Sequence, residues 1–121
     1  MRVDNVKKKQ IYDMLTKSWS IETSSKWTSE NPAKGQCGVT ALVVQDLYGG
    51  EIKKTKVGEV WHFYNLIDGK VFDFTEIQFN EEVNYMGVKS NREEALADTN
   101  KKQYSILKEK IMKEFKLSFD S

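Results

Sequence analysis

Apolar residues recur at helical spacing near both ends of the chain. The stripe in residues 4–18 consists of Val6, Ile11, Met14 and Leu15, with Trp19 just beyond. The stripe in residues 100–116 consists of Tyr104, Leu107, Ile111 and Phe115. A single apolar stripe among polar residues is typical of an amphipathic helix that packs against a core. We therefore predict one helix near each end.

Residues 38–48 differ because they are apolar on most sides. Their apolar residues recur at intervals of three and four, and Gly49-Gly50 supply a stop signal. The β-branched residues would also suit a strand, but the length and the two glycines favour a helix. We predict a central, buried helix, preceded by an irregular segment (20–36) in which Trp27 acts as an anchor.

The middle of the chain has the pattern of strands. Residues 51–57 predict an edge strand that is protected by its lysines. In residues 59–79, two runs rich in aromatic and β-branched residues flank Asp68-Gly69, a strong signal for a hairpin. Residues 90–93, with the form of a capping box, predict the start of another short helix. The pattern as a whole predicts one α+β domain spanning residues 1–121.

Composition excludes several classes of function. The chain is 39% hydrophobic and 31% charged, too apolar for a disordered protein and too polar for a membrane protein. Its 19 basic and 18 acidic residues nearly cancel, so we expect neither nucleic acid nor an anionic membrane as a partner. With no leader or span in the pattern, we expect a cytoplasmic protein. One cysteine and one histidine cannot complete a structural zinc site of such ligands, and we expect no metal or other cofactor.

The single cysteine, Cys37, falls at the start of the predicted helix 38–48. A helix N-terminus stabilises a thiolate over a thiol, so an activated cysteine would suit this position. The flanking Gly35 and Gly38 permit the close approach of a substrate or of another backbone segment. The alternative is a buried, inert cysteine.

The predicted hairpin brings the only histidine close to an aspartate. A two-residue turn at 68–69 fixes the register, so Tyr64 lies opposite Asp73. By the same count His62 lies opposite Thr75, on the same face. His62 and Asp73 are then diagonal neighbours roughly 7 Å apart at the backbone, a gap that an imidazole and a carboxylate can bridge.

These residues are the components of a Cys–His–Asp triad. Cys37 would be the nucleophile and His62 the proton acceptor and later donor, while Asp73 would orient the ring. A thiolate–imidazolium pair would hold the pKa of Cys37 well below its usual value. The alternative is a partly buried strand histidine and a polar residue at a strand end.

The order of these residues resembles a known catalytic superfamily. Gly35-Gln36-Cys37, His62 with Tyr64 two residues on, and Asp73-Phe74-Thr75 resemble the Cys, His and Asp-x-Thr signatures of the transglutaminase-like branch of the papain-like superfamily. The resemblance implies a papain-like α+β core, in which the cysteine opens a central helix packed on a small antiparallel sheet. Gly38 stands where transglutaminases proper have a bulky aromatic, a difference that argues against protein cross-linking.

Longer stretches between about residues 11 and 115 resemble the YunG family of small bacterial proteins. They are KSWSIETSSKW, NPAKGQCGVTALVVQDLYGGEI, FDFTEIQF and KKQYSILKEKI. The expected activity comes from the resemblance to the papain-like superfamily. That resemblance implies a cysteine hydrolase or acyl transferase acting on an amide, isopeptide or thioester of an unidentified peptide or small molecule. Gln36, Trp27 and Tyr64 are candidates for oxyanion or substrate contacts. The alternative is a papain-like fold that acts as a binding or regulatory module.

Overall fold

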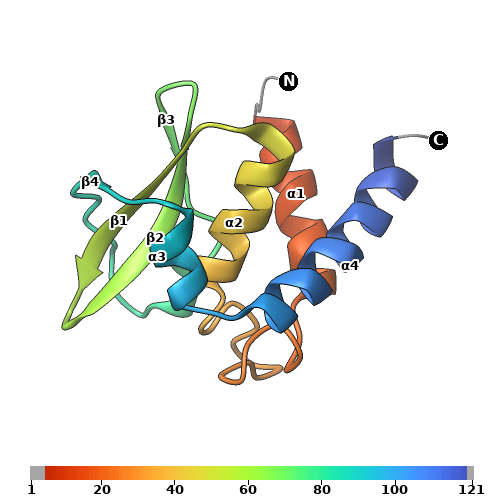
Figure 1. Cartoon of the computed structure of the whole chain (residues 1–121), viewed down its shortest axis with the longest axis horizontal. Coiled ribbons are helices and arrows are strands. Elements are labelled where there is room, and N and C mark those ends of the chain that lie inside the picture. The colour runs from red at the N-terminus through yellow and green to blue at the C-terminus, as the bar shows by residue number, and fades with distance from the viewer. Residues whose placement is uncertain (1–4, 120–121) are drawn as a thin grey trace.

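A computed structural model describes residues 5–119 and gives an α+β fold with four α-helices and a four-stranded antiparallel sheet within those residues (Figure 1). The elements follow in the order α1 (Asn5–Ser18), α2 (Cys37–Tyr48), β1 (Glu51–Val57), β2 (Val60–Ile67), β3 (Lys70–Phe72), the 3₁₀ helix η1 (Glu76–Gln78), β4 (Val88–Lys89), α3 (Arg92–Ala97) and α4 (Lys101–Phe119). None of the described helices is long and apolar enough to cross a membrane.

The predicted helices all form, with small differences at their ends. The predicted start of the first helix at Asp4 lies outside the described residues, and so does the side chain of Val6. α2 begins at Cys37, one residue before the predicted start. The N-cap of α3 is Asn91, whose side chain accepts a hydrogen bond from the Glu94 N–H. The capping motif was therefore predicted one residue too early.

α2 is the central element of the fold. Figure 1 shows it between the sheet and the pair formed by α1 and α4. The larger hydrophobic cluster joins α2 to these two helices and to the β2–β3 hairpin; its members include Ile11, Leu15, Val39, Val43, Ile67, Phe72, Leu107 and Ile111. A smaller cluster joins α2 to β1, β2 and α3 and consists of Cys37, Ala41, Leu42, Ile52, Phe63 and Ala95. The central, buried position predicted for this helix is confirmed.

The β2–β3 hairpin turns at Asp68-Gly69, as predicted. Both turn residues have positive φ angles, 52° and 77°, as a type I′ turn requires. The register pairs Ile67 with Lys70, Leu66 with Val71 and Asn65 with Phe72. Turn chemistry alone therefore set the register correctly near the turn.

The ladder ends at Phe72, before it reaches the predicted site residues. The expected pairs of Tyr64 with Asp73 and of His62 with Thr75 do not form. The reason is local: the Asp73 Oδ1 atom accepts hydrogen bonds from the Thr75 N–H at 3.1 Å and from its hydroxyl at 3.3 Å. This Asx-type turn replaces the next ladder bonds and bends the chain away from β2.

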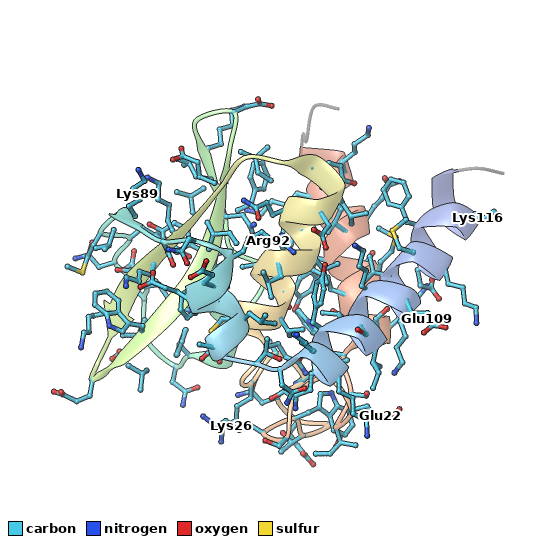
Figure 2. All side chains as sticks on the ribbon, viewed as in Figure 1. Glu22, Lys26, Lys89, Arg92, Glu109 and Lys116 are labelled. Carbon is cyan, nitrogen blue, oxygen red and sulfur yellow. The ribbon has the colours of Figure 1, made fainter. Side chains whose placement is uncertain are left out.

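The prediction that residues 51–57 form an edge strand was wrong. The strand order is β3-β2-β1-β4, so β1 lies between two neighbours. β4 pairs with it at only two positions, Lys53 with Lys89 and Lys54 with Val88. Figure 2 shows Lys89 at the outer border of the sheet. A strand of two residues has no periodicity that a sequence pattern could reveal.

Candidate functional site

Cys37 lies in the wall of a cleft of about 300 Å³. The cleft is lined by the loop before α2, the start of β2, the end of η1 and the connection from α3 to α4. Lys26, one of the lining residues, extends from the loop at the end of the molecule where α2 begins (Figure 2). Cys37 is 8% exposed, so its side chain is largely buried yet borders the cleft.

The Cys37 thiol donates its hydrogen bond to Asp98. The Sγ–Oδ2 distance is 3.3 Å, and the Gly38 N–H donates to the same oxygen at 3.1 Å. Asp98 is the C-cap of α3, so this short helix places its end against the start of α2. A Cβ atom at Gly38 would come within 2.6 Å of both Asp98 Oδ2 and the Ala95 carbonyl oxygen. A bulky residue after the cysteine, as in transglutaminases proper, would not fit beneath α3.

Burial raises the pKa of the Cys37 thiol above its usual value, and the negative charge of Asp98 raises it further. A hydrogen bond from the Phe63 backbone N–H lowers the pKa but is outweighed. Burial also raises the pKa of Asp98, against the lowering effect of the hydrogen bonds from Cys37 and Gly38. The low thiol pKa expected at a helix N-terminus is therefore absent from this arrangement, because desolvation and a like charge outweigh the helix dipole.

His62 and Asp73 form a buried pair. The His62 Nε2 and Asp73 Oδ2 atoms are 2.6 Å apart, and the histidine is 0% exposed. A carboxylate only accepts hydrogen bonds, so Nε2 donates to Asp73, and in the tautomer with this single proton Nδ1 is an acceptor. Among the residues that the structure describes, this Nδ1 atom has no hydrogen-bond partner. The predicted proximity of His62 and Asp73 is confirmed, although Asp73 reaches the ring from beyond the end of β3.

Several donors hold the Asp73 carboxylate in place. Besides its bonds to Thr75, it accepts a hydrogen bond from the Tyr85 hydroxyl at 2.8 Å. The same hydroxyl lies 3.0 Å from Glu76, and burial, followed by the charge of Asp73, raises the pKa of Tyr85. Tyr85 therefore remains a neutral donor. Its role was not predicted from the sequence, because the segment between η1 and β4 has no periodic pattern.

The three residues predicted for oxyanion or substrate contacts do not line the cleft. Gln36 is fully buried, and its Oε1 atom accepts a hydrogen bond from Thr23 at 2.9 Å. Trp27 packs against the larger core cluster, as expected of an anchor. Tyr64 is 2% exposed, and its hydroxyl accepts a hydrogen bond from the Gly87 N–H at 3.0 Å.

Three residues that do line the cleft beside Cys37 were not predicted from the sequence: Asp98, Gln78 and Phe79. Phe79 packs edge-on against the His62 ring, with centroids 4.8 Å apart. Their positions depend on how α3 and η1 dock against the loop before α2, and this long-range packing leaves no motif in the sequence. Within residues 5–119, no three His, Cys, Asp or Glu side chains are grouped so that they could hold a metal ion.

The fold and site define a small α+β protein with a cysteine at the start of its central helix and a buried His–Asp pair that joins β2 to the residue after β3. The chain belongs to the YunG family: the family model described as YunG protein matches residues 7–116. It is 57% identical over 96 residues to a protein of Bacillus subtilis (strain 168) named "Uncharacterized protein YunG", an alignment that covers 79% of this chain and 84% of that protein. No solved structure matches the chain. The predicted family is confirmed.

Proposed function

We propose that the protein is a papain-like cysteine hydrolase or acyl transferase that uses Cys37, His62 and Asp73 on an amide, isopeptide or thioester. The observation that carries the proposal is the unpartnered Nδ1 atom of His62, which Asp73 orients through the opposite ring nitrogen. The backbone N–H of the next residue in β2, Phe63, lies close enough to the Cys37 thiol to lower its pKa, so the thiol lies beside the strand that carries His62. Among the described residues, no hydrogen bond joins the thiol to the ring. A buried ring nitrogen without a partner is unusual in a folded protein and fits a proton-transfer role.

The reaction would proceed in two steps. In the first, the Cys37 thiol passes its proton to His62 Nδ1 as the sulfur attacks the carbonyl carbon, and Asp73 stabilises the resulting imidazolium. The bond to the leaving group then breaks, and His62 protonates that group. In the second step His62 takes a proton from water, whose oxygen attacks the thioester, and the C–S bond breaks to release the acid and regenerate the thiol. An amine acceptor in place of water would give acyl transfer.

The hydrogen bond between Cys37 and Asp98 is present in the protein without a substrate. Since the thiol is neutral and bonded to Asp98 there, the reaction requires the thiol to exchange this partner for His62. A substrate that enters the cleft would contact both Cys37 and Asp98, which line it. We therefore expect the thiol to react slowly in the free protein, with His62 acting as a general base during attack rather than holding a preformed thiolate.

The test uses p-nitrophenyl acetate, a small ester that acetylates thiols and releases coloured p-nitrophenolate. We expect acetylation of Cys37, detected by intact mass, and a rate that falls about 10²-fold or more in His62→Gln, the usual effect of losing a general base. Cys37→Ala is the control for reaction at other side chains. Equal rates in the wild type and in His62→Gln, with both proteins folded, would overturn the proposal.

A second candidate is a binding module, favoured by the surface at the cleft mouth. Trp61 lines the cleft, is 39% exposed, and lies between Lys54 and Lys56, whose Nζ atoms are 4.6 and 4.9 Å from the ring centroid. Aromatic rings beside cations are common in binding sites. Full complementation of a null strain by a Cys37→Ser protein would favour this function over catalysis.

A further inference from the structure

Two of the buried polar atoms without hydrogen-bond partners belong to Gln36 and Gln78, next to the start of α2, whereas another, the Tyr48 hydroxyl, lies at the far end of that helix. Among the described residues, the buried side-chain nitrogen and oxygen atoms without a hydrogen-bond partner belong to Trp27, Gln36, Tyr48, His62 and Gln78. Gln36 immediately precedes Cys37, and Gln78 is bonded to the loop that leads to it. Buried polar groups are normally paired, so the two free amide groups near Cys37 require an explanation.

Gln78 is held at both its side chain and its backbone, with its amide nitrogen free. The Gly35 N–H donates to Gln78 Oε1 at 3.1 Å, and the Asn31 side chain donates to the Gln78 carbonyl oxygen at 3.2 Å. Because a backbone N–H can only donate, the oxygen end of the amide must face Gly35. The other end is an NH₂ group, and its nitrogen is buried and unpartnered. Both anchors belong to the loop that ends at Cys37.

Gln78 is better placed for a substrate contact than Gln36. Gln78 lines the same cleft as Cys37, whereas Gln36 does not line it and is 0% exposed. The Thr23 hydroxyl lies against the Gln36 amide at 2.9 Å and directs that side chain into the core. Of the two residues with a free amide nitrogen, Gln78 is the one that lines the cleft.

We propose that the Gln78 side-chain NH₂ group is an oxyanion donor of the site. The inference rests on the proposed acyl chemistry, in which the carbonyl oxygen of the substrate gains negative charge as Cys37 attacks. Preorganised donors at that oxygen are a large source of rate acceleration. The Cys37 N–H, which the first turn of an α-helix leaves without an intrahelical partner, is a second donor. The next N–H, that of Gly38, is occupied by Asp98.

Two reagents distinguish a contact of Gln78 with the oxyanion from an effect of Gln78 on the reactivity of the Cys37 thiol. Acetylation of Cys37 by p-nitrophenyl acetate passes through an oxyanion, whereas alkylation by iodoacetamide does not. We expect Gln78→Met to slow acetylation about 10²-fold, the usual loss for one oxyanion donor, while alkylation changes by less than about twofold. Gln10→Met is the matched control, because it makes the same side-chain change at an exposed position of α1 that does not line the cleft. We expect it to change neither rate.

A second variant shows whether the effect of Gln78→Met comes from a disturbed fold. Gln78→Glu keeps an oxygen facing Gly35 but replaces the free donor with an acceptor, so the ratio of acetylation to alkylation should fall at least as far as in Gln78→Met. An unchanged ratio in both folded variants, while His62→Gln still slows acetylation, would overturn the role of Gln78 and leave the proposed function standing. Equal acetylation of wild type and His62→Gln would overturn the proposed function and this inference together.

Discussion

Replacing Asp98 by asparagine removes the negative charge that faces the Cys37 thiol while keeping the shape of the side chain. The amide oxygen of the new side chain can still accept the Gly38 N–H bond that Asp98 accepts at 3.1 Å. Because the Asp98 charge raises the pKa of the thiol, its removal lowers that pKa. The fraction of thiolate at a given pH then rises, and so does the rate of alkylation.

The size of the effect follows from two opposing terms. A like charge in contact shifts a pKa by about one to three units, and Asp98 is itself exposed, which places its effect at the lower end of that range. Each unit by which the thiol pKa falls makes the thiolate about tenfold more abundant, but a less basic thiolate is a weaker nucleophile by roughly threefold. The net expectation is alkylation about 3- to 10-fold faster at a fixed pH near 8.

The assay is the rate of iodoacetamide modification of Cys37, followed by intact mass. Glu93→Gln is the matched control, because it removes one negative charge from the exposed face of the same short helix, α3. In the wild type the rate should keep rising with pH through the neutral range, since the thiol pKa is raised. If Asp98→Asn is folded and is alkylated no faster than Glu93→Gln, Asp98 does not hold the thiol neutral.

Three further predictions test the surroundings of the site. Tyr85→Phe removes a donor to Asp73 and should slow Cys37 acetylation about fivefold, equivalent to roughly 1 kcal/mol; an unchanged rate would refute a role for this hydroxyl. Gly38→Ala should lower the free energy of unfolding in urea by about 1–3 kcal/mol, because its Cβ would overlap with Ala95 and Asp98, and a neutral result would contradict the close packing of α3. Leu107, on α4, is 0% exposed, so Leu107→Ala should lower the free energy of unfolding by about 2–5 kcal/mol. Met112, on the same helix, is 47% exposed, so Met112→Ala should lower it by less than about 0.5 kcal/mol. Equal losses in the two variants would contradict the packing of α4.

The helices and the hairpin could be predicted because their signals are local. The apolar stripes of α1 and α4, the apolar run of α2 and the Asp68-Gly69 turn each lie within a short window of sequence. β4 could not be predicted, because its two residues become a strand only by pairing with β1. The end of β3 could not be predicted exactly, because the Asp73 side chain takes the Thr75 N–H bond that continued pairing with β2 would need. A count of strand register does not include such side-chain bonds.

The candidate site was predictable in part for the same reason. Hairpin geometry alone brought His62 and Asp73 together, and the structure confirms their contact. The environment of Cys37 was not predictable, because the Asp98 carboxylate reaches it from 61 residues further along the chain. A helix N-terminus favours a thiolate only when the thiol is not buried against a carboxylate, so the sign of the pKa shift depends on tertiary packing.

The central claim is that His62 and Asp73 act as one unit on the Cys37 thiol. A double-mutant cycle of p-nitrophenyl acetate acetylation, with His62→Gln, Asp73→Asn and the double variant, tests it most directly. We predict that Asp73→Asn slows acetylation about tenfold or more when His62 is present and has little further effect in the His62→Gln protein. Equal effects of Asp73→Asn in both backgrounds, or no effect in either, would contradict the claim.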